Sequence, residues 1–302
     1  MTAAKTIRVT ANHINFEVLT MGSGDRLALC LHGFPEHAFS WRFQMPVLAR
    51  LGYRVWAPNL RGYGATDSPP GLQFYQTESL VADVVGLIEA AGARETLVVA
   101  HDWGGLLAWI VAMRHPHLVH RLVILNVPHP ACFVREFRRP SQVLRSWYML
   151  FFQVPVLPEL LMGIRGARLI ARAIRLTSSD RARFPPEVTE VYRQNAARKG
   201  GLTAMLNWYR GLLRGGGLRR CRDSGFPKIQ APTLVLWGGA DRFFTARALL
   251  CTEEFVADLT LRLLPGVSHW VQQEAPEAVN AMLDAWLSAA RVPEYAEVTS
   301  AQ

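Results

Sequence analysis

Cysteine is scarce in this chain of 302 residues, which contains only Cys30, Cys132, Cys221 and Cys251. The four lie far apart and none forms a C-x-x-C pair. Zinc-binding domains and disulfide-stapled domains need closely spaced or paired cysteines, so this spacing argues against both. The spacing predicts thiols in a reducing compartment, and we therefore expect a cytoplasmic protein.

Long hydrophobic runs are also missing. The most apolar segment, from Trp147 to Met162, is interrupted by Gln153, Pro155 and Glu159. A membrane-spanning helix needs about 20 consecutive apolar residues, and the chain start lacks the apolar stretch of a signal peptide. We therefore expect no membrane span and predict that segment 147–162 is buried or lines a cleft.

Acidic residues are few in one part of the chain. Residues 129–222 contain 18 basic and 5 acidic residues, a net charge of +13, whereas the remainder carries −4. The arginines recur at helical spacing among apolar residues, which favours a solvated helical surface. The alternative is attraction to an anionic surface or to nucleic acid. No nucleic-acid-binding motif accompanies the charge, so we expect no nucleic-acid partner.

Short apolar runs bounded by turn residues predict buried strands. The runs are continuous rather than alternating, which is typical of a parallel sheet covered on both faces. They cover residues 27–31, 53–57, 96–100, 122–126, 233–237 and 259–263. Helical patterns at 79–91, ending at Gly92, and at 103–113 lie between them, and residues 1–16 resemble a strand pair around Asn12. This alternation predicts a doubly wound α/β sheet.

The alternation of strands and helices stops after Asn126. For about ninety residues the pattern is helical, and strand signal resumes near Pro232. We therefore predict a core domain of residues 1–128 and 229–302, with a helical cap of residues 129–228 inserted after the sixth strand. Pro185 and Pro186 divide the cap, and Pro227 marks its exit.

The segment Val98 to Gly105 carries the strongest chemical signal. A buried strand runs directly into a helix, with small residues at positions 100, 104 and 105. Such a sharp turn exposes the residue at its apex, here Asp102. A plain helix cap is the alternative role for this residue. A carboxylate is ionised at neutral pH and suits attack on a saturated carbon that bears a leaving group, which would produce an alkyl ester.

Hydrolysis of such an ester needs a base. His269 follows the last predicted strand in a loop with Gly266 and Ser268, and Asp241 follows the preceding strand in a glycine-rich loop. The order Asp102, Asp241, His269 is that of nucleophile, acid and base in α/β hydrolases, and strand ends are where parallel sheets form their sites. The alternatives are a packed histidine and a turn-forming aspartate.

Two backbone N–H groups are candidates to bind the oxyanion formed during ester hydrolysis. The segment Leu31 to Glu36 follows another predicted strand and places Phe34 next to the turn. We predict that the N–H groups of Phe34 and Trp103 are the donors. His32 is expected to be structural and to hydrogen-bond the loop backbone.

These residues resemble the α/β-hydrolase-fold epoxide hydrolases, which are close relatives of the haloalkane dehalogenases. The matching segments are H-G-F-P at 32–35, R-G-Y-G-A-T-D at 61–67 and A-H-D-W-G-G at 100–105. The resemblance extends from about Asn12 to Trp286 and implies an α/β-hydrolase fold, with a mostly parallel eight-stranded sheet, helices on both faces and an inserted helical cap. It also implies two cap tyrosines that hold the epoxide oxygen, and these fall on Tyr148 and Tyr209.

The resemblance implies a reaction that needs no metal or organic cofactor. The partner would be an apolar or aromatic small-molecule epoxide, converted to a vicinal diol in a detoxification role. His115, His117 and His120 lack acidic companions and are interpreted as a helix end and loop, not as a metal site. The apolar cap surface could support a homodimer.

Two other functions stay open at this point. A haloalkane dehalogenase would share Asp102, Asp241 and His269; Phe34 stands where many dehalogenases have asparagine, although Trp103 is retained. A catalytically inactive binding module usually loses one of these residues or the cap tyrosines, and this chain keeps all five. A serine esterase is disfavoured because an aspartate replaces the serine.

Overall fold

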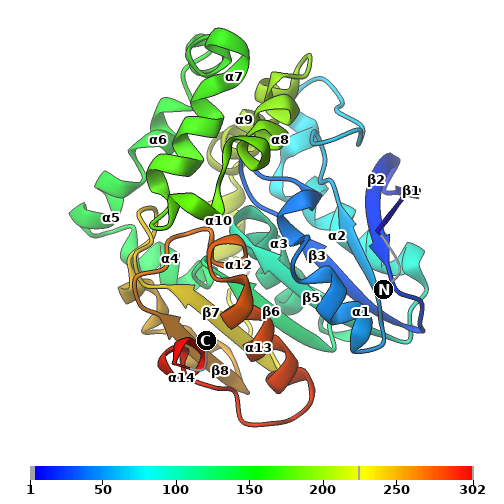
Figure 1. The fold of residues 1–302 in the computed structure, drawn as a ribbon. Coiled ribbons are helices and arrows are strands. Elements are labelled where there is room, and N and C mark those ends of the chain that lie inside the picture. The colour runs from blue at the N-terminus through cyan, green and yellow to red at the C-terminus, as the bar shows by residue number, and fades with distance from the viewer. Residues whose placement is uncertain (1–3, 224, 301–302) are drawn as a thin grey trace.

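The computed structural model describes residues 4–223 and 225–300, without the side chains of Leu218 and Cys221. One eight-stranded sheet with the order β1-β2-β4-β3-β5-β6-β7-β8 forms the centre of the molecule (Figure 1). The strands are β1 (Lys5–Ala11), β2 (Ile14–Met21), β3 (Arg26–Leu31), β4 (Tyr53–Pro58), β5 (Glu95–His101), β6 (Arg121–Leu125), β7 (Thr233–Gly238) and β8 (Leu259–Leu264).

The sheet confirms the strand predictions. β1 and β2 form an antiparallel pair whose turn holds Asn12 and His13 at φ 47° and 61°. β2 pairs antiparallel with β4, and every pairing from β4 through β8 is parallel. Asn126, predicted as the end of a strand, lies just beyond β6 with φ 45°. The carboxyl ends of β3, β5, β6, β7 and β8 therefore share one edge of the sheet.

Helices cover both faces of the sheet, as the α/β-hydrolase fold requires (Figure 1). One hydrophobic cluster packs α2 and α3 against the sheet and extends into the cap, and a second packs α1 and α13 on the opposite face. Gly92 ends α2 in the left-handed conformation, as predicted. The core helices are α1 (Met45–Arg50), α2 (Thr77–Ala91), α3 (Asp102–Arg114), α11 (Thr252–Phe255), α12 (Val271–Glu274), α13 (Pro276–Leu287) and α14 (Tyr295–Thr299).

Between β6 and β7 the described residues form helices and no strand. These helices are α4 (Pro130–Glu136), α5 (Pro140–Arg145), α6 (Trp147–Phe151), α7 (Leu157–Thr177), α8 (Pro186–Ala197), α9 (Gly201–Arg214) and α10 (Gly217–Asp223). They lie over the carboxyl edge of the sheet (Figure 1). We keep residues 129–228 as the proposed extent of the cap.

The 61–67 turn holds the cap in place. The indole N–H of Trp208 in α9 donates to the carbonyl of Arg61 at 3.1 Å, and the Arg198 guanidinium donates to the carbonyl of Gly62 at 2.8 Å. Arg61 itself forms a buried ion pair with Asp83 in α2. A motif noted only for its resemblance thus links the sheet to the cap.

The prediction of free thiols is wrong for two cysteines, because Cys132 and Cys251 form a disulfide. Cys132 lies in α4 after β6, and Cys251 precedes α11 after β7. These strands are neighbours in the sheet, so side chains 119 positions apart in the sequence meet, a proximity that linear spacing does not reveal. Cys30 is a buried free thiol, and the side chain of Cys221 lies outside the described part.

The prediction for segment 147–162 is half correct. Trp147, Tyr148 and Met162 line a cavity, but Leu150 and Leu160 are exposed to solvent. No helix in residues 4–223 and 225–300 combines the length and hydropathy needed to cross a membrane.

Candidate active site

Asp102 stands at the apex of the turn between β5 and α3. Its φ is 48°, a left-handed conformation that an L side chain rarely adopts and that marks functional positions. The turn is tight: a Cβ at Gly33 would collide with the Asp102 side chain, and one at Gly104 would collide with the backbone of Leu31. The small residues around the apex are therefore required by backbone packing, as the sequence indicated.

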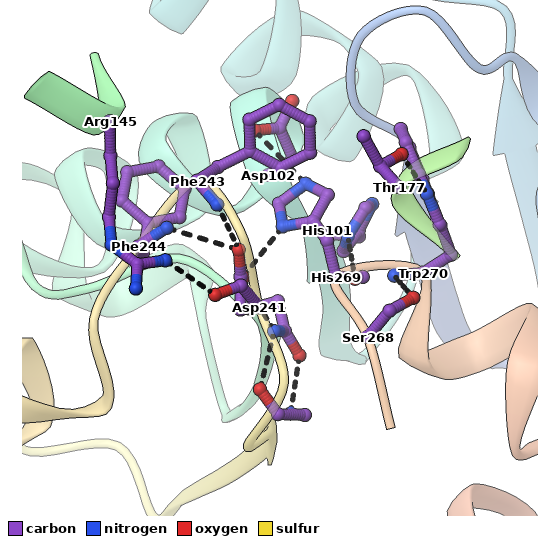
Figure 2. A network of polar contacts seen from close by, with 12 residues as sticks. His101, Asp102, Arg145, Thr177, Asp241, Phe243, Phe244, Ser268, His269 and Trp270 are labelled. Atoms are coloured by element: carbon purple, nitrogen blue, oxygen red, sulfur yellow. Dashed lines mark hydrogen bonds and ion pairs between the residues drawn. The ribbon is translucent and has the colours of Figure 1, made fainter. Parts of the chain in front are cut away.

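His269 lies between two carboxylates (Figure 2). Its Nδ1 is 2.8 Å from Asp241 Oδ2, and its Nε2 is 3.6 Å from Asp102 Oδ2. Burial lowers the pKa of His269, but the charge of Asp241 and the contact with the Asp102 carboxylate outweigh it and raise that pKa to about 10. Burial raises the pKa of Asp102, but His269 outweighs it and leaves the pKa below its ordinary value. The resting site thus holds an imidazolium between two carboxylates.

Asp241 is fixed by four hydrogen bonds. Its Oδ1 accepts from the amides of Phe243 and Phe244 at 2.6 and 3.0 Å, and its Oδ2 accepts from His269 and from Asn126 Nδ2, the latter at 2.7 Å. Asn126 also accepts from the amide of Gly238 at 2.8 Å. A role for Asn126 was missed, although its place at the strand end beside β7 was a signal for it.

The amide of Phe34 already donates to Asp102 Oδ1 at 2.9 Å. Trp103 is the second residue of α3, and N–H groups in a first helical turn have no intrahelical acceptor. His32 is fully buried; its Nε2 accepts from the amide of Leu60 at 3.0 Å and its Nδ1 lies 3.0 Å from the carbonyl of Gly33. Burial lowers the pKa of His32 to about 4, so it is neutral and holds the loop backbone as expected.

Tyr148 in α6 and Tyr209 in α9 face Asp102 from the cap. Their ring centres are 5.9 Å apart, and both line the same two cavities as Asp102. Burial, followed by the charges of Asp102 and Asp241, raises the pKa of Tyr148 above its ordinary value. Burial, followed by Tyr148 and Asp102, raises that of Tyr209. Both phenols are therefore protonated donors at neutral pH.

The two cavities meet at Asp102 and the tyrosines. The outer one encloses about 450 Å³ and is lined by core residues such as Phe34 and His269 and by cap residues such as Trp147. The inner one is small, about 50 Å³, and is lined almost entirely by apolar side chains, among them Leu106 and Phe133. A molecule that reached Asp102 from the outer cavity could place an apolar group in the inner one.

A second buried pair supports the histidine loop and was also missed from the sequence. His101 Nδ1 lies 2.8 Å from Glu36 Oε2, and His101 Nε2 lies 2.9 Å from the backbone carbonyl of His269. Glu36 also accepts from the side chains of Gln272 and Gln273 in α12. This network fixes the backbone that carries the His269 ring.

No group of three or more histidine, cysteine, aspartate or glutamate side chains within the described chain is placed to hold a metal ion. Asp102, His269 and Asp241 contact one another, and Tyr148 and Tyr209 line the same cavity as Asp102, so the arrangement brings together two carboxylates, a charged histidine and two phenols.

Comparisons with known proteins agree with this geometry. The α/β hydrolase fold model matches residues 29–276. The chain is 36% identical to Epoxide hydrolase 3 of Xenopus tropicalis, over 92% of this chain and 76% of that protein. It is 33% identical to Epoxide hydrolase 4 of Homo sapiens, over 92% and 76% respectively. A crystal structure of the Bacillus megaterium epoxide hydrolase with an inhibitor superposes with a TM-score of 0.83 at 30% identity, over 93% of this chain and 100% of that one. The chain therefore belongs to the α/β-hydrolase-fold epoxide hydrolase family.

Proposed function

We propose that the chain hydrolyses an apolar or aromatic epoxide to a vicinal diol through a covalent ester on Asp102. The observation that carries this proposal is the position of an ionised carboxylate, at the apex of a strained turn, beneath two protonated phenols in one cavity. The carboxylate supplies a nucleophile for a ring carbon, and the phenols supply acidic hydrogens for the ring oxygen.

In the first step an oxygen of Asp102 attacks the ring carbon, and the carbon–oxygen bond of the epoxide breaks. The leaving oxygen takes a proton from Tyr148 or Tyr209, and the other phenol stabilises it by a hydrogen bond. The enzyme then holds a hydroxyalkyl ester, one tyrosinate and the imidazolium of His269. Transfer of the imidazolium proton to the tyrosinate leaves both groups neutral.

The esterification itself prepares His269 to act as a base. The Asp102 charge is one of the causes that raise the pKa of His269, and the ester is uncharged. Loss of that charge lowers the pKa of the imidazole, which can then take a proton from water. The resulting hydroxide attacks the ester carbonyl, while the N–H groups of Phe34 and Trp103 hold the oxyanion. Collapse releases the diol and restores the Asp102 carboxylate and the imidazolium.

Halide displacement is the alternative reaction for the same triad. A departing halide needs N–H donors from tryptophan or asparagine side chains; Trp103 beside Asp102 could supply one, but Phe34 offers none. Tyr148 and Tyr209 line the same cavity as Asp102, where their hydroxyls could donate to a departing oxygen that remains bonded to the product. An inactive binding module would not need the intact series of Asp102, His269 and Asp241.

The test compares the two reactions directly. We expect the purified protein to convert styrene oxide to phenylethanediol and to release no halide from haloalkanes. The Asp102→Ala variant should form no diol, and His269→Gln should form the ester but not hydrolyse it, so that intact-protein mass spectrometry finds the mass of one bound epoxide. Halide release without diol formation would replace this proposal with a dehalogenase.

Two further expectations remain predictions. A homodimer through the cap and a cytoplasmic location are both compatible with the proposed reaction. The cysteine spacing no longer supports a cytoplasmic location, because the Cys132–Cys251 disulfide is more typical of oxidising compartments.

A further inference from the structure

Exposed apolar side chains gather on one side of the cap. Of the sixteen large hydrophobic residues exposed in the described chain, twelve lie between positions 143 and 176. They belong to α5, α6 and α7 and to the loop before α7, which lie together along one side of the cap (Figure 1). We call these the cap rim: Val143, Leu144, Trp147, Leu150, Val154, Val156, Leu157, Leu160, Leu161, Ile164, Leu169 and Leu176.

Part of the cap rim lies at the mouth of the active site. Leu144, Trp147 and Leu169 line the outer cavity that leads to Asp102, and Trp147 and Leu144 are 62% and 77% exposed. A soluble monomer rarely exposes a contiguous apolar patch larger than a few hundred Å² without an interaction to cover it.

A row of arginines runs beside the apolar rim. On the second half of α7, Leu169 and Ala173 face the outer cavity, whereas Arg168, Arg172 and Arg175 face a separate groove of about 650 Å³. Arg165, Arg181 and Arg193 complete the basic lining of this groove. One face of this helix therefore lines the mouth of the active site, and the adjacent face carries positive charge.

Acidic groups do not neutralise this surface within the described chain. The one acid of the groove, Glu190, is bound by Arg193 at 2.5 Å. The one acid between positions 143 and 176, Glu159, forms an ion pair with Arg210 at 2.6 Å. Glu190 also attracts Arg168, but six arginines line the groove, so it keeps a net positive charge.

We propose that the cap rim and the α7 arginines bind the surface of an anionic lipid bilayer. Leucine and tryptophan beside arginine are the combination that inserts into the headgroup region while the basic face meets lipid phosphates. A second copy of the chain is a poorer occupant, because a symmetric contact through this surface would bring the two arginine rows together. The active-site mouth would then open toward the membrane, and an apolar epoxide could enter from the lipid; this consequence rests on the proposed function.

The binding test uses the inactive Asp102→Asn protein as well as the active one, so that the result does not depend on catalysis. Both should co-sediment with vesicles of phosphatidylcholine and phosphatidylglycerol, less with phosphatidylcholine alone, and less at high salt. Brominated lipid should quench tryptophan fluorescence, and Trp147→Phe should remove most of the quenching. Failure of vesicle binding in a protein that still forms diol would overturn this inference and leave the proposed function intact.

Paired variants separate the two parts of the surface. Arg168→Gln/Arg172→Gln should weaken partition to anionic vesicles about 30-fold, or about 2 kcal/mol at about 1 kcal/mol for each arginine. The control Arg94→Gln/Arg291→Gln removes the same charge from exposed positions of the core domain and should have little effect.

The apolar part of the surface has its own pair of variants. Leu150→Ser/Leu160→Ser should weaken binding to both vesicle types, whereas Leu250→Ser, on the core domain, should not. Equal effects of the two arginine pairs, or self-association that Leu150→Ser/Leu160→Ser abolishes without any vesicle binding, would contradict the proposal.

Discussion

Tyr148 and Tyr209 distinguish opening of an epoxide from displacement of a halide in the proposed reaction. Tyr209 is buried and Tyr148 is partly buried beside the charge of Asp102, and that environment raises their pKa values. A neutral phenol can donate its hydrogen to a developing alkoxide. The side chains that line both cavities are Asp102, Tyr148 and Tyr209, and of these the two phenols are the proton donors, because Asp102 is ionised.

Removing either phenol should slow formation of the ester. We expect Tyr148→Phe and Tyr209→Phe each to lower the rate of ester formation about 100-fold, the typical effect of losing one donor to a developing oxyanion. The double variant should lose ester formation. Rapid-quench mass spectrometry measures this step, with Tyr295→Phe, in α14, as the control. Unchanged rates in both single variants would remove the tyrosines from the mechanism.

Asn126 should act on the second step more than on the first. Its amide holds the Asp241 oxygen that orients His269, and a hydrogen bond to a charged group contributes about 1.5–3 kcal/mol. Asn126→Ala should therefore slow ester hydrolysis about 10- to 100-fold and let ester accumulate, whereas Asn280→Ala, in α13, should not. Equal slowing of both steps would indicate a structural role only.

The charge of His269 should make folding stability depend on pH. Its folded-state pKa is raised from 6.5 to about 10, so the imidazolium contributes stability that is fully present below pH 6.5 and is lost as the pH rises toward 10. The difference in unfolding free energy between the native protein and His269→Gln should shrink over this interval. Denaturant titrations at a series of pH values measure it, and a difference that stays constant with pH would mean that His269 is neutral in the folded protein.

At the scale of elements, the strands were predictable and the contacts between distant elements were not. Continuous apolar runs such as 96–100 and 233–237 identify buried parallel strands because both faces of each are covered. The partners of Asp241 and of His269 were harder to foresee: Asn126 reaches Asp241 from the neighbouring strand, and His101 at the end of β5 reaches the loop after β8, past two intervening strands. The helical pattern predicted the cap, but not that segment 147–162 would be partly exposed.

The disulfide between α4 and the segment before α11 should stabilise the join between cap and core. Closing a loop of this length typically contributes about 2–5 kcal/mol, so Cys132→Ser or Cys251→Ser should lower the thermal midpoint. A thiol assay on the denatured protein without reductant should detect at most two of the four cysteines as free thiols. Reductant should lower the thermal midpoint of the native protein as far as either variant does. Four thiols without reductant would show that the bond does not form in solution.

At the scale of the whole molecule, the sheet and the cap each contribute half of the site. The sheet edge supplies the Asp102 turn, Asp241 and His269, and the cap supplies the two phenols and the rim of the mouth. Trp208 and Arg198 tie the cap to the 61–67 turn. Sequence patterns predict each half separately, but only the packed molecule brings them to one cavity.

The central claim is that the carboxylate of Asp102 becomes covalently bonded to the substrate, and labelling tests it most directly. With enzyme in excess over epoxide, one turnover is run in heavy-oxygen water, and the peptide that contains Asp102 is then analysed by mass spectrometry. Water attacks the ester carbonyl in the proposed reaction, so the label should enter the Asp102 side chain while the diol stays unlabelled. Label in the diol and none in Asp102 would show that water opens the ring directly, and would contradict the covalent mechanism.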